Sequence, residues 1–67
     1  MSVFQARDIV EFAIRIEENG ENFYRFAVQL ARDEDTKKLF GQLANAEVAH
    51  KKTFEKIFAA MDKTAPP

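Results

Sequence analysis

Hydrophobic residues recur every three or four positions along almost the whole chain. Before residue 32 they include Ile9, Phe12, Ala13, Ile16, Phe23, Phe26, Ala27 and Leu30, and after residue 36 they include Leu39, Phe40, Leu43, Ala44, Phe54, Ile57, Phe58 and Met61. This spacing is the period of an amphipathic helix. Good helix formers dominate, and both prolines are the last two residues of the sequence. The pattern predicts an all-α chain with one helix over about 4–32 and another over about 35–62.

One polar cluster, residues 32–36, separates the two predicted helices. Either Asp33 or Asp35 is suited to cap the second helix, because an aspartate oxygen accepts hydrogen bonds from the free N–H groups of a helix start. Two helices of similar length joined by a short connection pack as an antiparallel hairpin. We therefore expect a single domain over 1–67, with 63–67 as a flexible tail.

The first helix has two apolar stripes. One stripe contains Ile9, Phe12, Ile16, Phe23 and Leu30, and the other, rotated by about 100°, contains Val10, Ile14, Tyr24, Val28 and Ala31. The second helix of the hairpin covers only one stripe, so a second copy of the chain has to cover the other. The pattern predicts a homodimer, or a higher oligomer of dimers, in which two hairpins form a two-fold symmetric four-helix bundle.

Composition narrows the class of protein further. The 67 residues contain no cysteine, which excludes disulfides and thiolate metal sites. The formal net charge is −1 and no basic patch stands out, which is atypical of a nucleic-acid-binding protein. No apolar run approaches the roughly 20 residues of a membrane span, and the N-terminus lacks a signal-peptide core. We expect a cytoplasmic protein with neither nucleic acid nor membrane as partner.

Three polar residues interrupt the apolar stripes. Glu17 lies within the second stripe of the first helix, and Glu47 and His50 lie within the stripe of the second helix. With the turn centred between the helices, residue i of the first helix lies level with residue 67 − i of the second. Glu17 is then level with His50 and Glu47 with Gly20, so all three polar residues fall in one layer. Gly20 leaves room for the Glu47 side chain.

This layer has the composition of a metal site. The residues Glu47-Val48-Ala49-His50 form an E-x-x-H sequence, in which positions i and i+3 project to the same side of a helix. Two chains would supply four carboxylates and two imidazoles, an oxygen-rich set that suits two iron ions per dimer, with manganese as the alternative. Zinc prefers more histidine or cysteine, and calcium does not favour imidazole.

The combined pattern resembles the ferritin-like di-iron superfamily, in its rubrerythrin and encapsulated-ferritin branch. The stretch from Glu11 to Tyr24 is similar to a rubrerythrin first helix, and the stretch from Leu43 to His50 is similar to the second. The resemblance implies that Glu17 is a terminal carboxylate ligand, Glu47 a bridging carboxylate and His50 the nitrogen ligand, with Tyr24 close to the metals.

The chain also departs from these families. Rubrerythrins carry two such helix pairs and usually a cysteine-rich domain, whereas this chain has one pair, which is closer to encapsulated ferritins. Those proteins often carry a C-terminal segment that docks inside a protein shell. Residues 63–67 contain no recognisable segment of that kind, so the sequence does not support a shell protein as partner.

The leading functional hypothesis is a di-iron protein with ferroxidase or peroxide-linked iron-oxidising activity, in iron handling or oxidative-stress defence. The alternative is a non-catalytic hairpin that dimerises or binds a partner, with the Glu/His layer as a buried network that sets its register. Tyr24 is equally suited to core packing and to a place beside the metals. Glu21 is interpreted as a solvated or auxiliary carboxylate, and Glu18 as an exposed charge.

Overall fold

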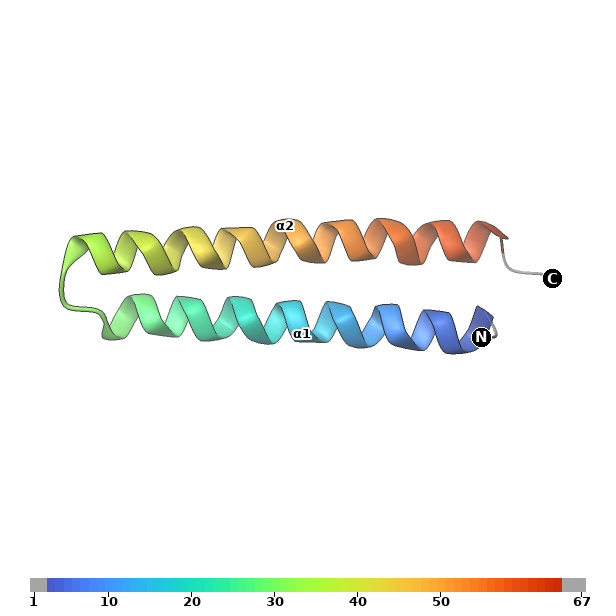
Figure 1. Ribbon diagram of the computed structural model, residues 1–67, viewed down its shortest axis with the longest axis horizontal. Coiled ribbons are helices and arrows are strands. Elements are labelled where there is room, and N and C mark those ends of the chain that lie inside the picture. The colour runs from blue at the N-terminus through green and yellow to red at the C-terminus, as the bar shows by residue number, and fades with distance from the viewer. Residues whose placement is uncertain (1–2, 65–67) are drawn as a thin grey trace.

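The computed structural model describes the backbone of residues 3–64 and the side chains of residues 5–61. Helix α1 spans Val3–Leu30 and helix α2 spans Glu34–Thr64, and the two run antiparallel (Figure 1). The predicted hairpin is therefore confirmed. Helix α1 ends two residues earlier than predicted, and α2 continues through Lys63 and Thr64, which were expected to belong to the tail. The other residues of the predicted tail, 65–67, lie outside the described residues.

Asp33 determines where α2 begins. One of its carboxylate oxygens accepts hydrogen bonds from the Thr36 backbone N–H at 2.9 Å and from the Thr36 hydroxyl at 2.8 Å. The first intrahelical bond, from Lys37 N–H to the Asp33 carbonyl, is 3.1 Å long. Asp33 is thus the N-cap, and Asp35, the other candidate, lies in the first turn, where its charge favours the positive end of the helix dipole.

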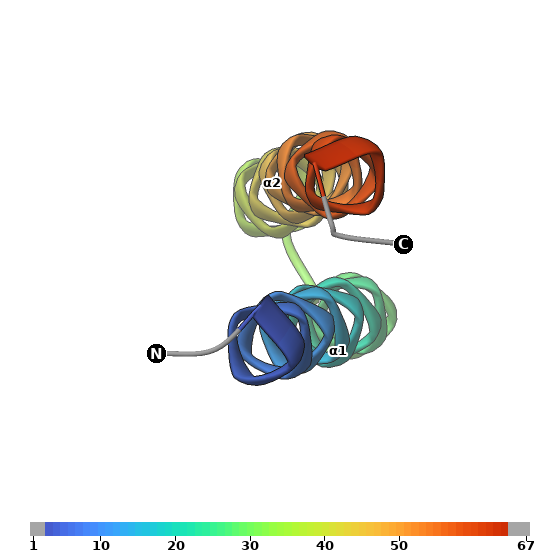
Figure 2. The same cartoon turned by 90° about the vertical axis from the view of Figure 1, so that its right-hand side faces the viewer.

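The two helices form a single layer, one helix beside the other (Figure 2). Between them Tyr24 stacks on Phe40, with ring centroids 6.2 Å apart, and the Arg7 guanidinium lies 4.8 Å from the centroid of the Phe58 ring. These contacts cover only one side of each helix. Among the described residues, Ala44 is the only hydrophobic residue that is fully buried.

Large apolar side chains remain exposed on the sides of the helices that face no neighbour. They are Ile9, Phe12, Ile16, Phe23, Phe26 and Leu30 of α1, and Leu39 and Ile57 of α2, with exposed fractions between 44% and 65%. The predicted second stripe of α1, in contrast, is half-buried against α2. The two stripes of α1 therefore have different environments, and the hairpin covers only one of them.

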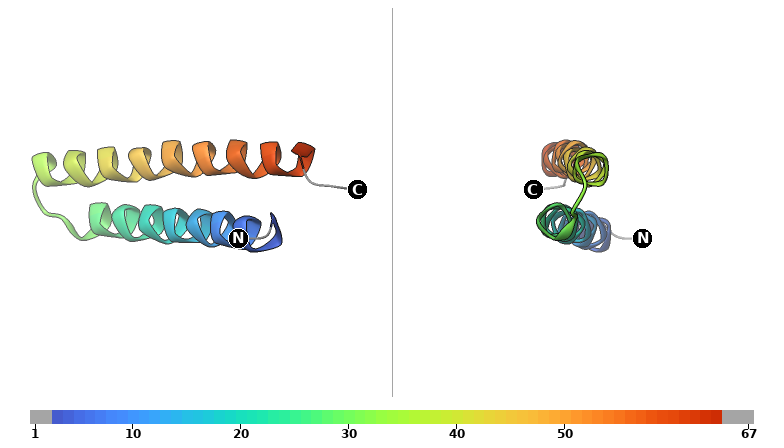
Figure 3. Two further views of the ribbon diagram at one scale, coloured as in Figure 1. Left: turned by 45° about the vertical axis from the view of Figure 1, so that its right-hand side comes forward. Right: turned by 90° about the vertical axis from the view of Figure 1, so that its left-hand side faces the viewer.

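The hairpin is long and thin, as its other views also show (Figure 3). It measures 53 × 15 × 14 Å and has a radius of gyration of 15.5 Å. A compact domain of this length has a radius of gyration of about 11 Å. Within the described residues, neither helix is both long and apolar enough to cross a membrane.

The Asp33 cap should contribute to stability in a pH-dependent way. Its hydrogen bonds, first the one from the Thr36 side chain and then the one from the Thr36 backbone, lower the pKa of Asp33 below its ordinary value of 3.8. A lowered carboxyl pKa stabilises the fold above the ordinary value, and this contribution is lost as the pH falls through the lowered pKa. We expect Asp33→Ala to lower the thermal midpoint at pH 7, measured by circular dichroism at fixed protein concentration.

The variant Asp33→Asn is the matched control, because its amide oxygen accepts the same hydrogen bonds but does not titrate. It should keep most of the midpoint at pH 7, and its midpoint relative to the unsubstituted chain should improve as the pH falls below 4. Equal midpoints of the alanine and asparagine variants at pH 7 would contradict the capping role.

Candidate metal centre

Glu17, Glu47 and His50 come together near the middle of the hairpin. One carboxylate oxygen of Glu17 lies 3.4 Å from His50 Nδ1, and one potential ligand atom from each of the three residues lies within 4.8 Å of the others. Glu17 comes from α1, whereas Glu47 and His50 lie one turn apart on α2. The predicted alignment of one carboxylate helix with the E-x-x-H helix is thus confirmed, and the three side chains occupy one layer.

Gly20 makes room for Glu47 in this layer. A Cβ atom built on Gly20 would lie 3.0 Å from Glu47 Oε2 and 3.1 Å from its carboxyl carbon, which is closer than almost all real Cβ contacts. A side chain at position 20 would therefore require the Glu47 carboxylate to shift by a few tenths of an ångström. The sequence predicted this pairing only from the equal heights of Gly20 and Glu47 along the hairpin. The structure shows that the Glu47 carboxylate itself fills the space beside the glycine.

The centre lies at the edge of the hairpin, not inside it. The Glu17 side chain is 17% exposed and Glu47 is half-buried, but the His50 side chain is 59% exposed. The sequence placed all three residues within apolar stripes and treated them as interior to a bundle. In one hairpin His50 is open because the side of α2 that carries it has no helix packed against it.

The carboxylates of the centre are poorly satisfied by protein groups. Glu17 Oε2 is buried and has no hydrogen-bond partner, although His50 Nδ1 is near. The pKa of Glu47 is raised above its ordinary value of 4.5, chiefly by a hydrogen bond with the Glu17 carboxyl group, which requires a shared proton. Partial burial and the negative charge of Glu17 raise this pKa further, and His50 acts in the opposite direction.

These features fit a bound cation. A buried carboxylate oxygen without a donor, and beside it a second carboxylate whose pKa is raised, both indicate a place where positive charge is missing. Two ligands of one ion, each about 2.1 Å from it, are separated by roughly 3.0–3.4 Å, close to the spacing of Glu17 and His50. Two carboxylates with one imidazole form an oxygen-rich set that suits iron or manganese.

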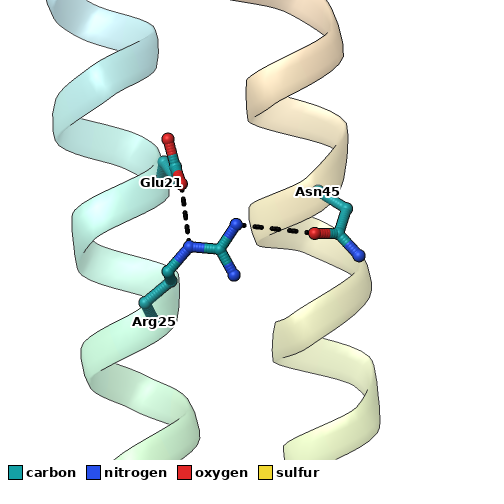
Figure 4. Close-up of polar contacts among 3 residues, drawn as sticks. All are labelled: Glu21, Arg25 and Asn45. Carbon is teal, nitrogen blue, oxygen red and sulfur yellow. Dashed lines mark hydrogen bonds and ion pairs between the residues drawn. The ribbon is translucent and has the colours of Figure 1, made fainter.

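A third carboxylate, Glu21, lies one turn after Glu17, but it is bonded to Arg25 and not to the other two carboxylates. Arg25 Nε donates a 2.8 Å hydrogen bond to Glu21, and Arg25 Nη2 reaches across to the side-chain oxygen of Asn45 on α2 at 3.5 Å (Figure 4). Sequence reasoning considered Glu21 but missed both partners. The i, i+4 spacing of Glu21 and Arg25 was an available signal, whereas the contact with Asn45 depends on how the helices pack.

Tyr24 lies on the same side of α1 as Glu17, seven residues closer to the connection. Its ring stacks on Phe40 and makes an edge-to-face contact with Phe23 at 5.6 Å between centroids. The half-buried ring therefore packs between the helices, as one of its two predicted roles requires. A role of its hydroxyl beside metals stays a prediction.

The chain is similar to a known protein family over most of its length. Residues 8–66 match the family model described as Rubrerythrin. The matched range includes all three residues of the centre. No curated protein and no solved structure matches the chain.

The two glycines of the chain, Gly20 in α1 and Gly41 in α2, allow a matched test of the metal centre. Glycine within a helix is less favourable than alanine by roughly 1 kcal/mol, and a Cβ at Gly41 would have nothing within 4 Å. Gly41→Ala should therefore raise helix stability and leave metal binding unchanged. Gly20→Ala should weaken iron binding, because its Cβ displaces the Glu47 carboxylate. Isothermal titration with Fe(II) under anaerobic conditions measures the iron affinity of each variant. Equal iron affinities of Gly20→Ala and Gly41→Ala would contradict the role of Gly20.

The raised pKa of Glu47 predicts the opposite pH dependence to that of Asp33. A carboxyl group whose pKa is raised on folding stabilises the fold below its ordinary value, here 4.5, and loses this contribution as the pH rises through the raised pKa. In metal-free protein, the midpoint of the unsubstituted chain should therefore fall relative to that of Glu47→Gln between pH 4 and pH 7. A constant difference between the two melting midpoints across this range would refute the shared proton.

Proposed function

Because the chain belongs to the rubrerythrin family and brings Glu17, Glu47 and His50 together in one layer, we propose that it is a di-iron carboxylate protein. Two copies of the hairpin would hold two metal ions between them, with manganese as the alternative to iron. The activity we propose is ferroxidase or peroxide-linked iron oxidation, in iron handling or oxidative-stress defence.

The observation that carries this proposal is the unsatisfied carboxylate of Glu17. Its buried Oε2 lacks a hydrogen-bond donor while an imidazole nitrogen and a second carboxylate lie beside it. Burying a carboxylate without a partner is costly, so a structural network would be expected to supply an N–H or O–H group there. A cation satisfies the three groups at once.

Only half of a di-iron centre is available in one hairpin. The chain contributes two carboxylates and one imidazole, and His50 is exposed on the open side. A second copy packed on that side would double the set to four carboxylates and two imidazoles, the number that two iron ions need in ferritin-like bundles. The exposed apolar side chains of both helices support the same arrangement, because a second copy would cover them.

The residues of the chain have distinct roles in this proposal. Glu17 and Glu47 provide the carboxylates, which tolerate a change of metal charge by changing their mode of binding, and His50 provides the nitrogen ligand. When bound, two iron ions would supply the redox chemistry, giving electrons to O2 or peroxide as Fe(II) is oxidised to Fe(III). The raised pKa of Glu47 favours its protonated form in the metal-free layer, and a bound cation would favour the carboxylate instead. Tyr24 and Phe40 stack on each other between the helices, nearer the connection than the three ligand residues.

A second candidate function is a non-catalytic dimerising hairpin in which the same three residues form a polar network. The hydrogen bond between Glu17 and Glu47 favours it, since a shared proton partly satisfies the layer without metal. Metal analysis separates the two functions. Protein purified from iron-supplemented cells should contain about one iron per chain if the di-iron proposal is right, whereas the network needs none.

Substitution of the centre should abolish tight iron binding without unfolding the helices. Glu17→Ala, Glu47→Ala and His50→Ala each remove two ligands from a symmetric dimer, so iron content and iron-dependent oxidation of Fe(II) by O2 should both be lost. Helix content by circular dichroism should persist, because Glu17→Ala and Glu47→Ala relieve repulsion between carboxylates and the side chain removed by His50→Ala is largely exposed. Iron at 100 times its dissociation constant should stabilise the unsubstituted protein by about 2.7 kcal/mol, and this gain should disappear in the variants.

Glu18→Ala is the matched control for these variants. Glu18 is exposed and points about 100° around the helix from Glu17, so its removal should leave iron content and oxidation rate unchanged. Undiminished iron binding by Glu47→Ala and His50→Ala, or loss of binding in Glu18→Ala, would show that the ligands are assigned wrongly.

A further inference from the structure

Helix α1 has two exposed sides of opposite character. One side, which we call the α1 seam, consists of Ile9, Phe12, Ile16, Asn19, Phe23, Phe26 and Leu30, all of them exposed. The other consists of Asp8, Glu11, Arg15, Glu18, Asn22, Arg25 and Gln29, which are also all exposed. Residues of the α1 seam alternate three and four positions apart, as at the a and d positions of a coiled coil. Asn19 is its single polar residue.

The occupant of the α1 seam that the structure supports is a second copy of the chain. The hairpin exposes 5269 Å², roughly 1,000 Å² more than a compact monomer of 7.7 kDa. A standard protein interface buries about 800 Å² on each partner. The excess surface of one hairpin is thus close to what one side of a stable dimer covers.

Asn19 lies at the height of the metal centre. Its chain neighbour Gly20 faces Glu47, and Glu17 faces His50, so the layer of the three ligands is level with residues 17–20 of α1. If two half-centres join on a two-fold axis perpendicular to the helices, that axis crosses α1 near Asn19. The two copies of α1 then run antiparallel, and residue i lies level with about residue 38 − i of the partner.

This alignment matches the composition of the α1 seam on both sides of Asn19. Phe12 becomes level with Phe26 of the partner subunit, and Ile16 with a position next to the partner's Phe23. Ile9 and Leu30 approach each other at the ends in the same way. Apolar residues therefore meet apolar residues along the seam, and Asn19 meets its own copy.

We propose that the two Asn19 side chains pair on the two-fold axis of the dimer and fix the antiparallel register that joins the two half-centres. This inference rests on the proposed di-iron dimer. A carboxamide has both donors and an acceptor, so two copies related by a two-fold axis can exchange reciprocal N–H to C=O hydrogen bonds. One buried asparagine in an apolar seam lowers affinity but penalises every register that leaves it unpaired. The metal centre needs such a device, because a slipped seam would separate the ligands.

Single cysteines test the pairing directly, because the chain has no cysteine of its own. A disulfide requires Cα atoms within about 7 Å of each other. Asn19→Cys should form a disulfide-linked dimer when the full chain is incubated with oxidised glutathione, as seen on a non-reducing gel. Asn22→Cys lies on the polar side, and Ile9→Cys would lie roughly 30 Å along the axis from its own copy, so neither should form the disulfide at a comparable rate.

The outcomes distinguish this inference from the proposed function. Sedimentation of the unsubstituted chain as a monomer at micromolar concentration would overturn the dimer and the pairing together. A dimer in which Asn19→Cys fails to cross-link, or in which Ile9→Cys cross-links as fast as Asn19→Cys, would overturn only the pairing. Preferential cross-linking of Asn19→Cys supports it.

A second substitution tests the pairing without oxidation. Asn19→Leu should tighten the dimer dissociation constant about tenfold, because an apolar residue replaces the one polar residue of the seam. Asn22→Leu makes the same chemical change on the polar side and should leave the constant unchanged. If sedimentation equilibrium shows the same dissociation constant for Asn19→Leu as for the unsubstituted chain, Asn19 lies outside the interface. A larger dissociation constant would contradict the expected cost of the one polar residue in the seam.

Discussion

Two helices cannot bury the apolar surface that this chain carries. Each helix of the hairpin has only one neighbour, so α1 buries one apolar stripe against α2 and leaves the other in water. Among the described residues Ala44 is the one hydrophobic residue that becomes fully buried, while Phe12, for example, stays 65% exposed. Small domains without disulfides need another source of stability, commonly a partner or a metal. The exposed α1 seam and the unsatisfied carboxylate each correspond to one of these sources.

The two sources are linked because they meet at the same height of the hairpin. The ligand layer lies level with residues 17–20, and the middle of the α1 seam is Asn19. A second copy that covers the seam about that point would bring a second set of ligands to the same level of the hairpin. In the proposed dimer, covering apolar surface thus completes the metal centre, and metal binding in turn removes the repulsion between carboxylates that a closed, metal-free layer would create.

The polar residues near the centre divide into two groups by their partners. Glu17 and Glu47 face each other with no cation of the protein between them, whereas Glu21 is neutralised by Arg25, which Asn45 also contacts. This difference separates the ligand candidates from a carboxylate only one turn away. Gly20 contributes because it has no side chain, and the Glu47 carboxylate occupies the space beside its Cα.

The spacing of apolar residues, together with the height of each residue along the hairpin, was enough to predict the hairpin and the residues that meet in the metal centre. A 3.6-residue pattern interrupted once specifies two helices, and the position of the interruption sets which residues of the helices are level, which is why Glu17 met His50 and Gly20 met Glu47. Family resemblance was readable for the same reason, since the motif residues lie at fixed helical spacings.

Tertiary structure alone decided the features that depend on side-chain direction across the gap between helices. It joined Arg25 to Asn45 and left Glu17 Oε2 without a donor. It also left His50 exposed in the single hairpin, whereas the predicted interior position of His50 belongs to a four-helix bundle of two chains. The choice of Asp33 over Asp35 as the cap was instead decided locally, by the hydrogen bonds from Thr36 to Asp33. A one-dimensional pattern gives the angle of a residue around its own helix, but which angles are covered depends on the rotation of the two helices about their axes and on how many neighbours they have.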